Sequence, residues 1–146
     1  MKFLFLSSLI SLAGSASAAS LSCPDASRFG VPTVTPTTVK AGDSISVFVD
    51  LTCGVKNFGF IPQFLDYSIE VPANENNGFE QPIILARRTI ASGTLSDSFT
   101  TTVPHAFYFA NAAYNIIVGN IYNINGTDGS PVLVKGDVFI PITIEV

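Results

Sequence analysis

The stretch Ser44-Ile-Ser-Val-Phe-Val-Asp-Leu-Thr52 alternates between apolar and polar side chains with a period of two. One face of this stretch carries Ile45, Val47, Val49 and Leu51, and the other carries Ser44, Ser46 and Asp50. Because successive side chains of a strand point to opposite faces of its sheet, the pattern predicts a half-buried β-strand.

Two further segments alternate in the same way. Apolar side chains occupy every second position from Val138 to Val146. Thr94–Val103 is a more polar version, with Leu95, Phe99 and Thr101 on one face. The density of serine and threonine in this second segment suits a strand with one hydrated face.

Less regular segments complete the set of predicted strands. Val31–Val39 is interrupted by Pro32 and Pro36, which favours an edge strand. Tyr114–Asn123 is apolar on both faces, which favours a central strand. The remaining candidates are Phe64–Val71 and Ile83–Ile90, and the expected turns are Ala41–Asp43, Asn74–Gly78, Ser92–Gly93 and Asn125–Ser130.

About seven short strands separated by turns predict an all-β fold, an immunoglobulin-like or fibronectin-like antiparallel β-sandwich. The spacing Pro104…Tyr114-x-Ile116-x-Val118 resembles the corner before strand F of such domains, where a tyrosine hydroxyl often ties down the chain. The chain has no tryptophan, and its cysteines do not match an antibody-type bridge. We expect one short helical turn within His105–Ala113.

The first residues resemble a secretory signal peptide. Lys2 is followed by the apolar run Phe3–Leu12 and by the small-residue site Ala16-Ser17-Ala18. We therefore expect residues 1–18 to be removed and residues 19–146 to form a single secreted, extracellular β-sandwich domain. Ile140–Val146 is too short and polar for a lipid-anchor signal, so no membrane anchor is expected.

The balance of charge argues against nucleic acid as a partner. The chain has 7 basic and 11 acidic side chains, and loss of Lys2 changes the formal charge from −4 to −5. Phosphate binding depends on clustered Lys and Arg. Only Arg87 and Arg88 are adjacent, and such a pair is more often a solvated strand end than a binding patch.

The cysteine count and one sequon predict two covalent features. Cys23 and Cys53 are the only cysteines, and in an exported chain they are expected to form a disulfide. Asn125-Gly126-Thr127 is an N-glycosylation sequon, so we expect Asn125 to lie on an exposed loop and to carry a glycan.

No catalytic, cofactor-binding or metal-binding residue can be named, and we expect that the protein is not an enzyme. A serine hydrolase would have to use His105, but no nucleophile motif accompanies it. One histidine and two paired cysteines are too few ligands for zinc or copper. Calcium could use Asn125 and Asp128, but an EF-hand-like pattern is missing and turn formation explains these residues completely.

Part of the chain resembles a known family. Thr35-Pro-Thr-Thr-Val-Lys-Ala-Gly-Asp-Ser-Ile-Ser46 and Tyr114-Asn-Ile-Ile-Val-Gly-Asn-Ile-Tyr122 are similar to the opening and closing strands of the fungal necrosis-inducing secreted protein (Nis-type) effectors. The resemblance implies a non-enzymatic effector that binds plant immune-receptor-associated kinases and suppresses defence. The insert Pro72–Pro82 and the cysteine pair depart from the family pattern.

These observations leave two main functional hypotheses. The first is a secreted interaction protein that binds a host protein through a face or an edge strand of the sandwich. The second is a cell-wall protein, either one that binds a wall polysaccharide through Phe107-Tyr108-Phe109 or a wall-associated structural protein. Neighbouring residues of an extended chain cannot all face one way, so one or two of these rings should pack into the core.

Overall fold

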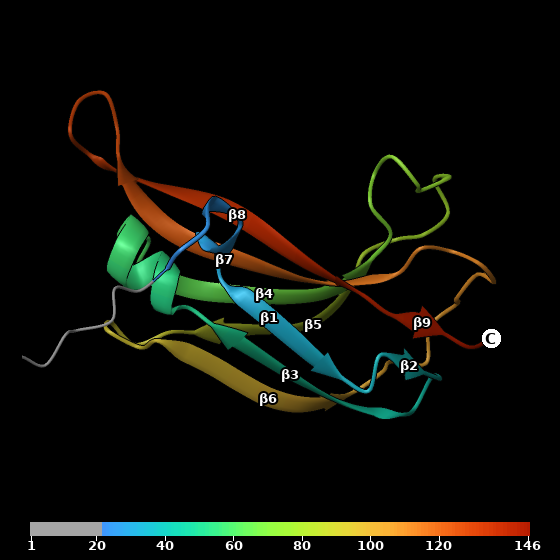
Figure 1. Cartoon of the computed structure of the whole chain (residues 1–146). Coiled ribbons are helices and arrows are strands. Elements are labelled where there is room, and N and C mark those ends of the chain that lie inside the picture. Colours follow the sequence, from blue (N-terminus) through green and yellow to red (C-terminus); the bar gives the residue numbers. More distant parts are fainter. Residues whose placement is uncertain (1–21) are drawn as a thin grey trace, which may run out of the picture.

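The computed structural model describes residues 22–146, and the expected signal peptide at residues 1–18 lies outside the described residues. The described chain forms two antiparallel sheets and one short parallel pair of strands (Figure 1). The three-stranded sheet contains, in spatial order, β1 (Val31–Thr35), β3 (Ser44–Asp50) and β6 (Ser96–Thr102). The four-stranded sheet contains β5 (Ile83–Thr89), β4 (Pro62–Glu70), β7 (Asn115–Asn125) and β8 (Pro131–Pro141). The parallel pair is β2 (Thr38–Val39) with β9 (Thr143–Ile144).

The prediction of an all-β fold is confirmed, and the five expected strands between Ser44 and Asn123 begin and end within two residues of strands in the structure. The expected strand Val31–Val39 is divided into β1 and β2. The edge position expected for the first strand is confirmed, since β1 pairs only with β3. The central position expected for Tyr114–Asn123 is also confirmed, because β7 lies between β4 and β8. The last alternating segment is divided, so that β8 begins at Pro131 and β9 follows separately.

The core lies between the two antiparallel sheets. The alternating face of β3 is buried there, as its pattern predicts, and β4 and β7 supply the opposite wall. Tyr67 of β4 packs edge-to-face on Phe99 of β6, with ring centroids 4.7 Å apart. The other side chains that are almost completely buried include Ile45, Leu51, Leu65, Ile69, Ile116, Val39, Val47, Val49, Val103 and Val118.

The corner before β7 has the hydrogen bond that the sequence predicts. Tyr114 is buried, and its hydroxyl accepts a hydrogen bond from the backbone N–H of Phe109 at 3.1 Å. The expected helical turn within His105–Ala113 is wrong, because this segment contains no helix. The helical turns of the described residues are instead η1 (Asp25–Ser27) and η2 (Gly54–Phe58).

A polar network ties the two sheets together at the side of β5 and β6. Asp97 of β6 accepts a hydrogen bond from the Tyr67 hydroxyl at 2.8 Å. The same carboxylate accepts two hydrogen bonds from the Arg88 guanidinium of β5, at 2.6 and 2.9 Å. The guanidinium also lies 5.2 Å from the ring centroid of Phe99. This network therefore satisfies polar groups that the packing of the sheets removes from water.

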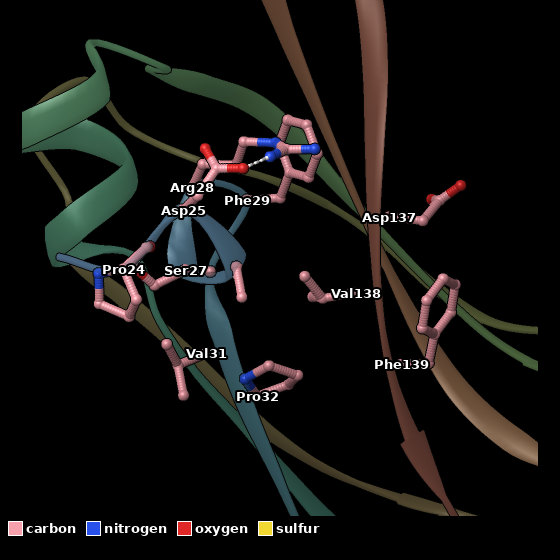
Figure 2. A pocket seen from close by; sticks show the side chains of 12 residues that line it. Pro24, Asp25, Ser27, Arg28, Phe29, Val31, Pro32, Asp137, Val138 and Phe139 are labelled. Carbon is pink, nitrogen blue, oxygen red and sulfur yellow. Dashed lines mark hydrogen bonds and ion pairs between the residues drawn. The ribbon is translucent and has the colours of Figure 1, made fainter.

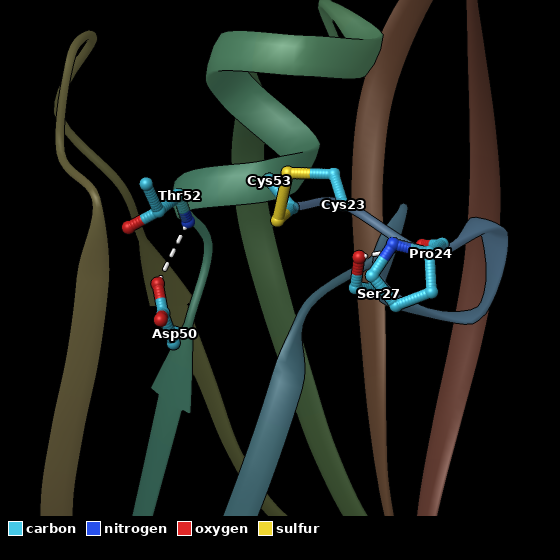
Figure 3. Close-up of a disulfide and its surroundings, with 6 residues drawn as sticks. All are labelled: Cys23, Pro24, Ser27, Asp50, Thr52 and Cys53. Atoms are coloured by element: carbon cyan, nitrogen blue, oxygen red, sulfur yellow. Dashed lines mark hydrogen bonds between the residues drawn. A yellow bond between two sulfur atoms is a disulfide. The ribbon is translucent and has the colours of Figure 1, made fainter. Parts of the chain in front are cut away.

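The predicted disulfide between Cys23 and Cys53 is confirmed (Figure 3). The two Cα atoms lie 5.5 Å apart and are separated by 30 residues in the sequence. The bond joins the segment before β1 to the helical turn that follows β3, where Thr52 N–H donates to the Asp50 carboxylate at 2.8 Å. A structural disulfide indicates an oxidising environment.

Candidate functional site

Exposed apolar side chains cross the outer face of the four-stranded sheet. The strand register places Phe139 of β8 opposite Ile117 of β7, Ile117 opposite Ser68 of β4, and Ser68 opposite Ile84 of β5. Phe139 and Ile84 are 60% and 70% exposed, respectively, whereas Ile117 between them is buried. Because neighbouring strands are about 4.8 Å apart, this row extends roughly 14 Å across the sheet.

On one side of Phe139 is a hollow that we call the edge groove. It has a volume of about 570 Å³ and lies between the segment Pro24–Pro32 and residues Asp137–Phe139 of β8. Both β1 and β8 are edge strands, so the groove follows the boundary between the two sheets. Figure 2 shows Val138 and Phe139 on opposite sides of the β8 ribbon, with Val31 and Pro32 across from Val138.

A second hollow, which we call the loop hollow, lies on the other side of Phe139. Its volume is about 620 Å³, and it lies between the Pro72–Pro82 insert and the outer face of the sheet. Phe139 and Ile117 form its apolar floor, and Glu70 and several residues of the insert form its walls. Since Phe139 lines both hollows, the edge groove and the loop hollow form one surface, which we call the Phe139 surface.

A row of ion pairs borders the apolar row on the same face. Arg87 donates two hydrogen bonds of 2.6 Å to Asp66, and Lys135 pairs with Asp137 at 3.0 Å. The hydrogen bond from Arg87 is the main reason that the pKa of Asp66 lies below its usual value. The Lys135 side chain lies over Gly119, where a Cβ atom would collide with it. These charges are already paired, so the apolar row is the part of this face that is free to bind.

The residues considered for catalysis and metal binding lie apart from this surface. His105 is exposed, and its ring lies 3.1 Å from the position that a Cβ on Gly42 would occupy. The Asp128 carboxylate accepts hydrogen bonds from both the backbone and the hydroxyl of Ser130, as in a turn. Within residues 22–146, no group of three or more His, Cys, Asp or Glu side chains could hold a metal ion.

The three aromatic residues considered for glycan binding differ in burial and contacts. Tyr108 packs edge-to-face on Tyr114 and donates a hydrogen bond to the carbonyl of Pro104. Phe107 is 95% exposed and Phe109 is 40% exposed. The prediction that one or two rings pack into the core is therefore confirmed for Tyr108.

Sequence reasoning missed Phe139, although the sequence contains a signal for it. Val138 and Ile140 belong to the alternating apolar face, so Phe139 falls on the opposite face with Pro141 and Thr143. A large aromatic residue on the polar face of an amphipathic strand indicates an exposed apolar surface. The two hollows beside it could not be found in this way, because distant segments form their walls.

The hairpin between β7 and β8 presents the predicted glycosylation site. Asn125 is exposed and is the last residue of β7. If the glycan is present, protein secreted from a fungal host should lose mass on treatment with an endoglycosidase, and the Asn125→Gln variant should not. Asn123→Gln, which leaves the sequon intact, is the control. An unchanged mass after treatment of the wild-type protein would refute the prediction.

No protein-family model and no curated protein matches the chain. Among solved structures, the superoxide reductase (neelaredoxin) from Ignicoccus hospitalis is 14% identical, with a TM-score of 0.48 over 78% of this chain and 80% of that chain. One variant of it is 14% identical, with a TM-score of 0.47 over 82% and 83%. Another variant is 15% identical, with a TM-score of 0.42 over 78% and 79%.

The matched structures are those of enzymes by name. They contradict the expectation that the protein is not an enzyme, and we withdraw that expectation. At 14–15% identity and with TM-scores below 0.5, they assign no reaction to this chain. Within residues 22–146, no helix is long and apolar enough to span a membrane.

Proposed function

We propose that this protein is a secreted interaction protein of the fungal effector type, which binds a host protein through the Phe139 surface. The observation that carries the proposal is the position of Phe139, which is 60% exposed between two hollows. Protein-binding surfaces centre on aromatic side chains that a partner can desolvate, and exposed apolar patches mark such surfaces. The resemblance to Nis-type effectors suggests plant immune-receptor-associated kinases as the partners.

The finer description of the fold is part of the proposal. We infer an immunoglobulin-like sandwich in which β1, β3 and β6 correspond to strands A, B and E, and β4, β7 and β8 to strands C, F and G. The hydrogen bond of Tyr114 at the corner before β7 supports this assignment. On this assignment, the Phe139 surface lies along strand G, at the open edge of the sheet.

Export is also proposed rather than observed. The signal-like sequence of residues 1–18 and the disulfide between Cys23 and Cys53 both support it. Neither feature identifies the partner, so the proposal depends on a direct binding test.

The Phe139→Glu variant tests the proposed surface. Affinity for a purified receptor-associated kinase domain is expected to fall about thirtyfold, which corresponds to about 2 kcal/mol for a central interface residue. Phe48→Glu is the matched control, because Phe48 is 43% exposed on the outer face of the other sheet. Isothermal titration calorimetry measures both variants after circular dichroism has shown that they fold.

Two outcomes would overturn the proposal. One is that no kinase domain binds the wild-type protein at micromolar concentration. The other is that Phe139→Glu binds as tightly as Phe48→Glu.

A second candidate function is polysaccharide binding, and the exposure of Phe107 favours it. A ring that is 95% exposed leaves its faces free to stack on a sugar. The wild-type protein should then sediment with insoluble glucan or chitin, and Phe107→Ala should remain in solution. Failure of the wild-type protein to sediment with either polymer would exclude this function.

A further inference from the structure

Some acidic side chains of the protein form ion pairs with basic side chains, and others have no basic partner. Of the six basic side chains in residues 22–146, five form ion pairs with acidic residues, namely Arg28, Lys40, Arg87, Arg88 and Lys135. Of the 11 acidic side chains, six therefore have no basic side chain beside them, and together with Lys56, which is in none of these pairs, they account for the formal charge of −5 on residues 22–146. Where these carboxylates gather determines which partner the surface favours.

Three of them lie at the loop hollow and its insert. Glu70 lines the loop hollow, and Glu75 and Glu80 belong to the insert that covers it. Among residues 22–146, none of the three has a basic side chain within ion-pair distance. Glu80 is only 6% exposed and accepts one hydrogen bond from the backbone N–H of Asn77 at 3.0 Å.

Two of these carboxylates also line a neighbouring hollow on the far side of the insert. Glu75 and Glu80 lie there with the segment Phe109–Ala113, which contains no charged residue. Of the three, only Glu70 lines the loop hollow beside Phe139 and Ile117, whereas Glu75 and Glu80 face the neighbouring hollow across the insert. A carboxylate with no cation beside it gains most when a binding partner brings a positive charge near it.

We infer that the loop hollow accepts a basic segment of the partner, in which an apolar side chain inserts against Phe139 while Lys or Arg side chains approach Glu70 in the hollow and the exposed Glu75 on the adjoining insert. The inference rests on the proposed function and specifies its partner. A second copy of the chain is disfavoured as the occupant, since two surfaces of the same net negative charge repel each other. Nucleic acid and phosphorylated segments are disfavoured for the same reason.

Short peptides test the chemistry of the hollow without the whole partner. We would titrate the isotope-labelled domain with acetyl-Lys-Phe-Lys-amide and with acetyl-Glu-Phe-Glu-amide, and follow backbone amides by NMR. The lysine peptide is expected to shift the amides of residues 70–80 and of Phe139, and the shifts should decrease as salt rises. Equal shifts with the glutamate peptide would overturn the inference.

A double variant then tests the carboxylates themselves. Glu70→Gln with Glu75→Gln should weaken binding of the lysine peptide about fivefold, as expected for two exposed ion pairs. The matched control is Asp50→Asn with Asp128→Asn, which changes the net charge equally at two carboxylates that also lack a basic partner but line neither the edge groove nor the loop hollow. Equal weakening in both double variants would show a general charge effect and overturn the inference.

The two proposals fail in different ways. If the kinase domain requires Phe139 but binds both double variants equally, the basic segment is wrong and the interaction surface stands. If the lysine peptide binds at the hollow as expected but no kinase domain binds, the kinase partner is wrong and the charge preference of the hollow stands.

Discussion

Replacing Cys23 and Cys53 together by serine is expected to lower the free energy of unfolding by about 3.5–4 kcal/mol. The bond closes a loop of 30 residues, and in the chain-entropy model its loss releases about that much unfolded-chain entropy. Urea denaturation of the oxidised wild-type protein and of the double variant measures the change. The reduced wild-type protein is the control and should match the variant.

The segment that the disulfide anchors also has non-covalent contacts with the rest of the fold. The segment before β1 is also held by the ring of Phe29, which lies so close to Gly136 of β8 that a Cβ atom there would collide with it. Asn120 donates one long hydrogen bond of 3.3 Å to the carbonyl of Phe29. A loss of less than about 1 kcal/mol in the double variant would show that these contacts fix the segment without the disulfide.

The disulfide also links stability to the candidate site. The segment Pro24–Pro32 forms one wall of the edge groove, whereas the Pro72–Pro82 insert forms the wall of the loop hollow. Loss of the bond should therefore disturb the edge groove first. The lysine peptide, which we assign to the loop hollow, should still bind the folded double variant.

The sequence predicted the strands whose two faces differ clearly. The alternation in Ser44–Thr52 arises because one face of β3 meets the core, and a period of two is visible in any such strand. The first half of β8 was missed because Lys135, Gly136 and Asp137 interrupt the alternation. These residues pack against Gly119 and Phe29, which are contacts that no local pattern reports.

The short helical turn was predicted in the wrong place for a related reason. η2 is one turn of five residues that follows the disulfide cysteine, so it is too short to show an apolar stripe. The segment His105–Ala113 is instead an irregular loop with a turn at Ala110 and Asn111, held by the hydrogen bonds of Tyr108 and Tyr114. Side-chain contacts of this kind decide the conformation of short segments whose own conformational preferences are weak.

Replacing Asp97 by alanine is expected to lower the free energy of unfolding by about 3 kcal/mol. The change leaves the buried hydroxyl of Tyr67 without its acceptor and removes both hydrogen bonds from Arg88. Asp66→Ala is the matched control, since Asp66 also binds an arginine through two hydrogen bonds but on the outer face of the sheet. The Arg87 side chain of this ion pair is exposed, so Asp66→Ala should lower the free energy of unfolding by less than about 1 kcal/mol.

The pH dependence of the free energy of unfolding distinguishes the contribution of the Asp97 charge from that of its packing. Burial raises the pKa of Asp97, but the hydrogen bonds from Arg88 and Tyr67 outweigh this effect, so the pKa lies below the usual value. A carboxyl group with a lowered folded-state pKa stabilises the fold above its unfolded pKa of about 3.9, and this contribution is lost as the pH falls further. The wild-type protein should therefore lose more stability than Asp97→Ala between about pH 5 and pH 2. If urea denaturation gave parallel curves for the two proteins, the network would stabilise the fold through packing and not through its charge.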